Sequence, residues 1–555
     1  MQPKHEHSYL PQLKERYAEG RVDRRDFLRL STLLGMSASA AYALVGKFGS
    51  LETISEAQAD TMPRGGTLRL AMKIMDISKP AVIDSNEKNN LLRQVCEYIT
   101  ITGQDNITRP YLAERWEPSD DLRTWTFYLR KNVKWRKGRS FTADDAIWNI
   151  KHVLDPATGS SVIGLMKGYM LNDVTKNGQA TVELWDANAI EKVDDYTFRL
   201  NCKVPQLAVP EHFFHYPFLM LDPEEGGNFQ VGSNGTGPFD LVEYDIRRTA
   251  AFKARKDYWG TGPYLDTLRF IDVGDDTGAA AAAIASGQVD GLYLAFADQL
   301  KTLQAVPRLK MYQTVTAETV VCRGKCTTKP FDDPRVRKAL RLAIDQRKML
   351  LLALAGIGAV AEHHHVSPIH PEYAKLPFFT RDTAAAKKLL AEAGYPAGID
   401  LEFTISNDRP YYSILAQAMI QQWQEVGIRV KIKQIPAQMY WDVWDKVPMG
   451  LTPWFHRPLG VMALGLAYRS GAPWNESSYS NPKFDQLIDK AGGILDVDKR
   501  REVMKELEEL LQEDGPITQP FWLTLYTFLD KRVKGFRMHP TSYIFGNELA
   551  IEAKA

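Results

Sequence analysis

The sequence has few cysteines and almost no net charge, and it has no long, strongly apolar run. The first two shortages argue against particular classes of protein and partner. Four cysteines in 555 residues are too few for a disulfide scaffold and too scattered for a structural zinc site. Lys+Arg 69 against Asp+Glu 68 gives a formal charge of +1, so nucleic acid is not an expected partner. Any recognition of charge must therefore be local.

The four cysteines are Cys96, Cys202, Cys322 and Cys326. Cys322 and Cys326 are close enough in sequence to form a bridge if the chain turns between them. Buried free thiols that pack as small apolar side chains are the other interpretation, and the sequence does not decide between the two.

Signatures of catalysis are also absent from the sequence. It contains no G-x-S-x-G nucleophile elbow, no H-E-x-x-H zinc motif and no phosphate-binding P-loop. The turn Asn234-Gly235-Thr236-Gly237-Pro238 lacks the Lys-Ser/Thr of a P-loop and indicates a tight backbone turn. We therefore expect a protein that is not an enzyme and has no cofactor. An exported hydrolase is a weaker alternative, based only on size and compartment.

The N-terminal sixty residues have the pattern of an export signal. Arg24-Arg25 precedes Phe27-Leu28, and a mildly apolar run extends from Leu30 to Val45. Ala57-Gln58-Ala59 then supplies small residues of the kind that signal peptidase requires. The stretch resembles a twin-arginine signal. We expect residues 1–59 to be removed after Ala59, with Ala43 as a second candidate site, and the mature protein to be periplasmic.

Length and periodicity predict a mixed α/β protein with more than one subdomain. The clearest expected elements are a strand at 67–72, helices at 88–99 and 334–351, a helix that begins after Thr142, and a small-faced alanine helix at 278–287 that packs on a sheet. Helices at 383–393, 412–425, 483–492 and 499–513 and strands at 122–129, 401–405 and 429–434 complete the pattern.

Two clusters could contact a ligand. The first is His363-His364-His365 with His370, which could bind a metal, contact an organic ligand through one ring such as His364, or pack in an irregular loop. The second is Trp454-Phe455-His456-Arg457, followed by Trp474-Asn475, in which aromatic rings flank a cation suited to carboxylate or phosphate. Tyr440 belongs to a neighbouring aromatic patch. A core strand that ends in a surface arginine is the alternative interpretation of the second cluster.

Several blocks in a fixed order resemble family 5 of the extracellular solute-binding proteins, which includes dipeptide, oligopeptide and nickel binders. They are Leu112 to Glu117, Trp125 to Arg130, Val133 to Trp135 with Phe141 to Asp145, Gly235 to Phe239, Asp257 to Trp259, Pro330 to Leu340, Leu389 to Pro396, and Tyr479 to Asp485. Each block alone is weak, and the ordered series is specific.

The resemblance implies a two-lobed type II periplasmic-binding-protein fold with an extra strand-rich subdomain and a ligand cleft between the lobes. It places the first lobe at 60–100, 231–315 and 528–555, the extra subdomain at 101–230 and the second lobe at 316–527. It also implies a protein, expected to be a monomer, that delivers its ligand to the membrane permease subunits of an ABC importer.

One departure from the family pattern concerns the ligand. In the peptide-binding members, an aspartate shortly after a tryptophan in the strand matching 451–458 binds the α-ammonium of the peptide. Arg457 stands in this stretch, and no acid occurs from Leu451 through Ser470. Because a cation there repels an ammonium and attracts an anion, we expect an anionic or peptide-like conjugate, such as a modified amino acid, an opine-like compound or a blocked peptide. A metal chelate is the alternative ligand.

Overall fold

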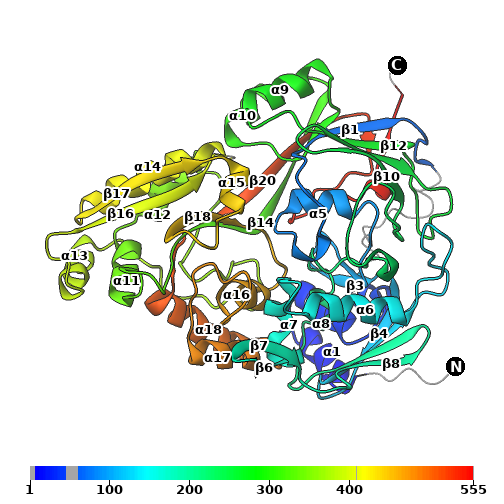
Figure 1. Cartoon of the computed structure of the whole chain (residues 1–555), viewed down its shortest axis with the longest axis horizontal. Helices are drawn as coiled ribbons and strands as arrows, with labels where there is room; N and C mark the ends of the chain where they lie inside the picture. Colours follow the sequence, from blue (N-terminus) through cyan, green and yellow to red (C-terminus); the bar gives the residue numbers. More distant parts are fainter. Residues whose placement is uncertain (1–6, 46–60, 408, 554–555) are drawn as a thin grey trace.

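The computed structural model describes residues 7–45, 61–407 and 409–553 as a mixed α/β structure (Figure 1). A large mixed sheet runs through the molecule in the order β10-β11-β12-β1-β13-β20-β14-β18-β16-β17, with β15 and β19 paired beside it. The strands are β1 (Thr67–Ala71), β10 (Phe239–Asp245), β11 (Thr249–Ala254), β12 (Thr267–Ile271), β13 (Gly291–Leu292), β14 (Leu309–Gly324), β15 (Ala359–Val360), β16 (Ile399–Ser406), β17 (Ile428–Ile435), β18 (Met449–Trp454), β19 (Ile517–Thr518) and β20 (Phe521–Asp530).

The two longest strands, β14 and β20, join the two ends of this sheet. We call them the hinge strands, the part built around β1 and β10 to β13 the first lobe, and the part built around β16 to β18 the second lobe (Figure 1). The antiparallel register of the hinge strands shifts between Val315 and Thr319. Such an irregularity bends a strand, and here it falls where the chain passes from one lobe to the other.

Helices cover both lobes. In the first lobe they are α5 (Asn86–Leu92), α9 (Thr277–Ser286) and α10 (Ala297–Gln304). In the second they are α11 (Pro334–Leu342), α12 (Gln346–Leu354), α13 (Thr383–Glu392), α14 (Pro410–Gln424) and α15 (Ala437–Trp441). The buried side chains of α16 (Gly460–Tyr468), α17 (Pro482–Gly492) and α18 (Val497–Asp514) share a core cluster with residues 112–220. The two-lobed α/β fold expected from the sequence is therefore present.

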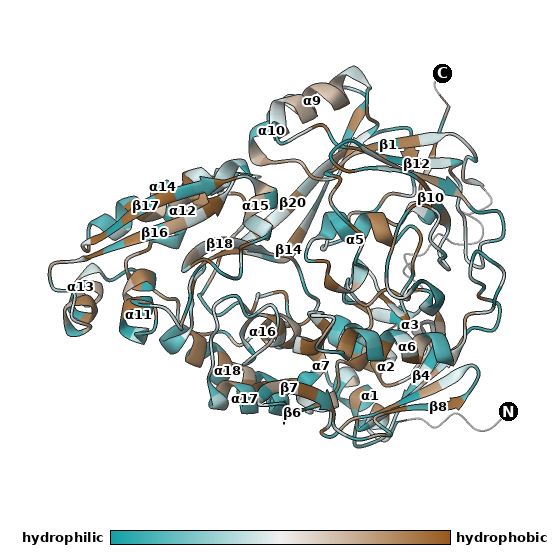
Figure 2. Cartoon of the chain, in the orientation of Figure 1, coloured by the Kyte–Doolittle hydropathy of each residue, from teal (hydrophilic) through white to brown (hydrophobic). Residues whose placement is uncertain are grey.

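The prediction for residues 334–351 was wrong. The single helix expected at 334–351 is two helices, because the Asp345 carboxylate accepts a hydrogen bond from the Lys348 N–H and starts α12 as its N-cap. The alanine helix α9 packs on the sheet as expected, through Ala283 and Ile284, which share a core cluster with Leu292 of β13. The rest of α9 is not buried, and the helix lies at the periphery of the molecule (Figure 2).

A separate four-stranded sheet, β4-β5-β9-β8, forms the strand-rich subdomain. Its hydrophobic core includes Trp125, Phe127 and Phe198, and the rings of Phe127 and Phe198 stack at 5.1 Å. The elements here are β2 (Thr100–Thr102), β3 (Thr108–Pro110), β4 (Ala113–Pro118), β5 (Thr124–Leu129), α6 (Ala143–Leu154), α7 (Val162–Met170), β6 (Leu171–Lys176), β7 (Gln179–Leu184), β8 (Ile190–Asp194), β9 (Thr197–Asn201) and α8 (Val209–His212).

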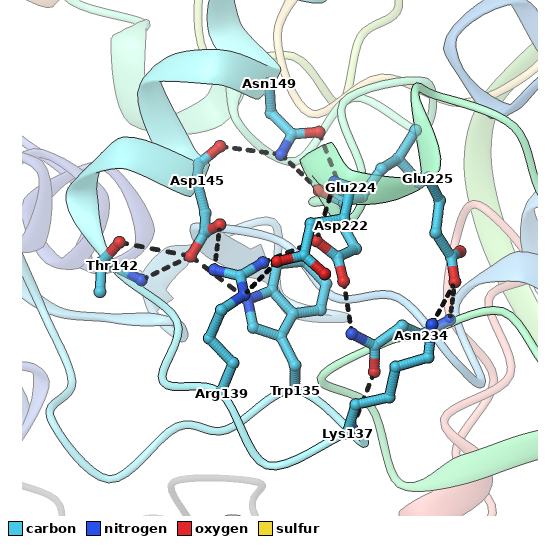
Figure 3. A network of polar contacts seen from close by, with 11 residues as sticks. Trp135, Lys137, Arg139, Thr142, Asp145, Asn149, Asp222, Glu224, Glu225 and Asn234 are labelled. Atoms are coloured by element: carbon cyan, nitrogen blue, oxygen red, sulfur yellow. Dashed lines mark hydrogen bonds and ion pairs between the residues drawn. The ribbon is translucent and has the colours of Figure 1, made fainter.

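The motif from Gly138 to Asp145 has a structural role in this subdomain (Figure 3). Asp145 is buried and accepts hydrogen bonds from the backbone N–H of Thr142 at 2.9 Å and from the Trp135 indole at 3.2 Å. The Arg139 guanidinium bridges Asp145 at 2.7 Å and Asp222 at 2.6 Å. The expected N-cap at Thr142 is thus part of a capping box that ties α6 to the loop before β10.

The glycine-rich turn at 234–238 is a site of close backbone approach, as the sequence indicated. A Cβ atom at Gly235 would lie 2.0 Å from the Val95 carbonyl oxygen, and one at Gly237 would lie 2.7 Å from it. The Gly237 N–H donates to that same oxygen at 2.8 Å. The turn therefore holds the start of β10 against the segment just after α5, and only glycine fits at positions 235 and 237.

The N-terminal segment contains α1 (Leu10–Ala18), α2 (Arg24–Leu33) and α3 (Ala38–Leu44). Arg24 and Arg25 are exposed, whereas Phe27, Leu30 and Leu33 are buried in the same core cluster as the four-stranded sheet. The expected cleavage site at Ala59 lies outside the described residues. Among the described helices, none is long and apolar enough to cross a membrane.

All four cysteines are free. Cys96, Cys202 and Cys322 are buried, and Cys326 is partly buried. Burial raises the pKa of each thiol, which keeps the sulfur protonated and unreactive. The bridge considered between Cys322 and Cys326 is not formed, and the free-thiol interpretation holds.

Candidate functional site

A cavity of 290 Å³ lies between the two lobes, and we call it the interlobe cavity. It belongs to both lobes, since the segments 73–75 and 272–275 face 436–441 and Phe455 across it. Its lining consists of Lys73, Ile74, Met75, Ser85, Glu87, Arg247, Asp272, Gly274, Asp275, Arg409, Pro436, Ala437, Gln438, Trp441 and Phe455. A cavity shared in this way changes shape whenever the lobes move relative to one another.

The walls of the interlobe cavity carry charges of both signs. Lys73 forms an ion pair with Asp275 inside the first lobe. Arg409, in the second lobe, approaches Glu87 of the first lobe at 3.6 Å, and both side chains are largely buried. A mixed lining of this kind suits a ligand that itself carries both charges, because each charge then finds a partner when water is expelled.

Arg247 adds a cation from the first lobe. It lies in the turn between β10 and β11, has a φ of 64°, and donates its backbone N–H to the Ile74 carbonyl at 2.9 Å. A non-glycine residue with this φ is uncommon and costs free energy. The Arg247 side chain is exposed, and among the described residues no carboxylate forms an ion pair with it. It is therefore available to an anion in the cavity.

The structure brings three of the predicted site residues together at the end of β18. The rings of Trp454 and Trp474 meet edge to face at 6.1 Å, and the Arg457 guanidinium carbon lies 5.9 Å from the Trp474 ring and 4.8 Å from the Tyr216 ring. Of the aromatic rings predicted to flank Arg457, Trp474 is thus beside it. Tyr216, which supplies the nearer ring, comes from the segment after α8 and was not anticipated.

Arg457 itself is buried, with 4% of its surface exposed. Its guanidinium donates to the carbonyl oxygens of Phe455 at 3.2 Å and His456 at 2.9 Å, while Nε has no hydrogen-bond partner in the described chain. No carboxylate among the described residues pairs with it. It lies two residues after Phe455, which lines the interlobe cavity, but Arg457 itself does not belong to the lining.

His456 connects the second lobe to two other parts of the molecule. Its Nδ1 accepts the Ala317 N–H from hinge strand β14 at 3.0 Å, so Nε2 carries the proton that is donated to Asn106 Oδ1 at 2.8 Å. Burial and nearby cations hold the pKa of His456 well below its usual value. The ring is therefore neutral, and its role in this structure is to link elements.

Tyr440 and Asn475 have local partners. The Tyr440 hydroxyl shares a hydrogen bond with Thr452 at 2.9 Å, and the Asn475 amide caps the turn that leads to Tyr479. The acid missing from 451–470 is found a few residues later as Glu476. Its carboxylate is occupied by Arg323, Thr452 and the Trp454 indole.

The histidine run diverges to separate partners, since His363 and His365 have φ values of 62° and 60°. His363 contacts Gln346 at 2.7 Å, His365 contacts Tyr468 at 2.8 Å, and His364 lies 3.5 Å from Glu362. His370 binds the Arg457 carbonyl at 3.0 Å. None of these rings lines the interlobe cavity, and within the described residues no three histidines, cysteines or acids are grouped to hold a metal.

Sequence reasoning missed Arg247 as well as Arg409, Glu87 and Glu318. Glu318, on hinge strand β14, is buried, and burial raises its pKa to about 7. Arg409 directly precedes Pro410, the first residue of α14, and this position gives no sign that its side chain reaches the first lobe. The absence of an acid from 451–470 was the one signal in the sequence, because it could have prompted a search for an acid on β14, the strand next to β18.

Comparison with known proteins identifies the family. The model of the bacterial extracellular solute-binding proteins, family 5, matches residues 108–496, more than half of the chain. The chain belongs to this family. Its members bind solutes and are not enzymes, as the missing catalytic motifs predicted.

Relatives and solved structures agree with this assignment. The dipeptide-binding protein DppE of Bacillus subtilis is 25% identical over 92% of the chain and 97% of its own length. The binding protein AgaA of A. tumefaciens R10, in complex with agropinic acid, has a TM-score of 0.79 at 20% identity, covering 88% of this chain and 99% of AgaA. NikZ of Campylobacter jejuni, in complex with Ni(L-His), has a TM-score of 0.73 at 19% identity, covering 87% and 99%.

Proposed function

We propose that this protein is the periplasmic substrate-binding component of an ABC importer. In this role it captures a small anionic or peptide-like conjugate, such as a modified amino acid, an opine-like compound or a blocked peptide. The ligand binds in the interlobe cavity, the lobes close over it, and permease subunits receive it. The protein acts as a monomer, exported through the twin-arginine signal at residues 1–59.

The observation that carries this proposal is the presence of arginine side chains around the interlobe cavity. Arg247 and Arg409 line it from opposite lobes, and Arg457, two residues after Phe455 in the chain, forms no ion pair with a carboxylate of the described residues. A buried guanidinium that forms no ion pair favours an anion in its neighbourhood. A structural neighbour that holds agropinic acid supports an anionic ligand, and relatives named for dipeptides support a ligand of similar size.

Closure explains how such a ligand gains affinity. A ligand that contacts both lobes binds the closed state better than the open state and shifts the population toward closure. A ligand carboxylate that bridges Arg247 and Arg409 has this property, because each arginine belongs to a different lobe. Loss of either arginine is expected to weaken binding roughly tenfold to a hundredfold, the range of one charge-assisted hydrogen bond.

The test begins with mass spectrometry of whatever co-purifies with the protein. Calorimetry then compares agropinic acid with a plain dipeptide on the chain from residue 60 onward and on its Arg409→Ala, Arg247→Ala and Arg457→Met variants. Methionine at 457 keeps apolar contact with Tyr216 and Trp474 while removing the charge. Tight binding of the plain dipeptide, undiminished in all three variants, would contradict the anionic-ligand proposal.

A metal chelate is the second candidate, because the structural neighbour NikZ is described in complex with Ni(L-His). In such a complex the chelating acid supplies ligands to the metal, so the protein needs few of its own. Equilibrium dialysis with nickel, in the presence and absence of L-histidine, separates this candidate from an organic ligand. Retention of nickel only with L-histidine favours the chelate, and no retention in either case rejects it.

A further inference from the structure

A second, smaller cavity lies against the hinge strands, and we call it the hinge pocket. Its volume is 110 Å³, and it takes its walls from the first lobe, the second lobe and β20. Most of the wall is apolar: Leu294, Phe296, Leu354, Ile357, Leu523 and Leu525. An apolar cavity of about 150 Å³ holds a molecule the size of benzene, so the hinge pocket matches a branched alkyl group of four or five carbons.

Glu318 is the one buried carboxylate in the wall of the hinge pocket. It lies in the irregular segment of β14, next to Thr319, which pairs with Trp454 of β18. Its Oε2 atom is buried and has no hydrogen-bond partner among the described residues. A buried polar atom without a partner costs free energy, and a ligand that supplies the partner recovers that cost.

The position of Glu318 is informative because β14 is the direct neighbour of β18. The residues at the end of β18 include Arg457 and no acid. Glu318 therefore supplies a carboxylate on the strand next to β18, and the segment 451–470 that includes β18 contains no acid of its own. Arg409 lines both the hinge pocket and the interlobe cavity, so the two cavities have this side chain in common.

We propose that the hinge pocket binds the positively charged nitrogen of the ligand, with Glu318 as its counter-charge and the apolar wall around the attached alkyl group. This inference rests on the proposed function and narrows it. Amino acids modified outside the α-amine, and opine-like compounds with a secondary amine, keep a protonated nitrogen, whereas a blocked peptide does not. The ligand thus carries an amine at the hinge pocket and an anionic group in the interlobe cavity.

The charged and titratable groups around Glu318 come from every element that packs on it. They are Glu87 of α5, Tyr293 after β13, Arg409 before α14 and Arg457 after β18. Burial raises the pKa of Glu318, Arg409 and Arg457 lower it, Glu87 raises it, and the net value is about 7. An ammonium group binds only the ionised carboxylate, so its affinity must increase as the pH rises through 7.

The test uses two probes of the same shape, 3-methylbutylamine, which is an ammonium below pH 10, and the neutral 3-methylbutanol. Ligand-observed NMR measures their dissociation constants on the full chain at pH 8 and pH 5.5. The amine is expected to bind at least tenfold more tightly than the alcohol at pH 8. Lowering the pH to 5.5 should weaken the amine roughly thirtyfold, since Glu318 is then mostly protonated.

Three variants test whether Glu318 causes the preference for the amine and its pH dependence. Glu318→Gln should remove both the preference for the amine and its pH dependence. Asp298→Asn is the matched control, because Asp298 also lines the pocket but its carboxylate already accepts the Thr277 hydroxyl at 2.8 Å. Ala353→Leu fills part of the pocket and should weaken both probes alike while Glu318 is retained, which keeps the test valid if Glu318→Gln does not fold.

Equal affinity for amine and alcohol, no binding of the amine, or an amine preference that persists in Glu318→Gln would each overturn the inference. None of these results touches the proposed function, because agropinic acid and plain dipeptides report on the interlobe cavity separately. Failure of both sets of measurements would reject the proposed ligand class as well.

Discussion

His456 lies just beyond β18 and holds three parts of the molecule together through one neutral ring. It accepts from Ala317 on a hinge strand and donates to Asn106 in the loop between β2 and β3. Aromatic and histidine residues beside a tryptophan suggested a ligand contact in the sequence. The structure shows in addition that both ring nitrogens are occupied by the protein itself.

Replacing His456 with alanine is expected to lower the free energy of unfolding by about 1–3 kcal/mol, because two buried polar groups lose their partners. Urea denaturation measures the loss. His152→Ala is the control, since the half-buried His152 ring stacks on Trp148 at 4.8 Å and none of its ring nitrogens makes a hydrogen bond in the described structure. Equal losses in the two variants would contradict the linking role.

Asp145 and Asp144 are neighbours on α6 with opposite environments. Asp145 is 3% exposed and binds Arg139, Trp135 and the start of the helix, whereas the Asp144 side chain is 69% exposed and pairs with Lys192. Asp145→Ala is expected to cost about 3 kcal/mol, because a cap and a charge-assisted bond are lost together. Asp144→Ala should cost less than about 1 kcal/mol. Thermal denaturation of both variants checks this difference, and similar values would contradict it.

At the scale of elements, the turn at 234–238 fixes the position of β10 relative to the segment that follows α5. Gly235→Ala would push a methyl group against the Val95 carbonyl, and we expect it to destabilise the protein by more than about 3 kcal/mol or to prevent folding. Gly465→Ala on α16 is the matched control, since its nearest neighbours lie 3.8 Å away. Calorimetric unfolding and soluble yield report the outcome. A Gly235→Ala variant as stable as the control would contradict this expectation, because it would show that the backbone at residues 95 and 235 separates without cost.

The elements themselves were predicted best where local chemistry decides them. Thr142 and Asp145 mark the start of α6, and the alternating segment at 67–72 is β1, Thr67–Ala71. The helix expected at 88–99 ends at Leu92, because its remaining residues turn toward the 234–238 segment.

At the scale of the whole molecule, the N-terminal helices form part of the folded body. The Tyr17 and Phe27 rings stack at 4.5 Å, the Trp116 indole donates to the Leu33 carbonyl at 2.9 Å, and Arg29 lies 3.7 Å from the buried Glu211. If the segment is removed after export, the mature protein loses these contacts. The precursor and the mature protein then differ in stability.

We expect the full chain to unfold at a higher temperature than a chain that begins at residue 60, because each buried apolar side chain of α2 contributes about 1.5–3 kcal/mol. Differential scanning calorimetry measures the shift. Leu30→Ala in the full chain should reproduce part of it, since Leu30 is fully buried, whereas Leu44→Ala, at a position 50% exposed, should not. Identical transitions for all four proteins would show that the segment does not stabilise the body.

The sequence by itself determined the family, the α/β class and the absence of familiar catalytic motifs, because these depend on ordered blocks, local periodicity and short capping patterns. It also placed one aromatic ring, Trp474, correctly beside Arg457. Only the tertiary structure decided which charges share the cavities. Glu87, Glu318 and Arg409 are far apart in the chain and meet because the hinge strands bring the two lobes together. A contact between distant segments leaves no local pattern, so neither the interlobe cavity nor the acid beside β18 could be derived from the sequence.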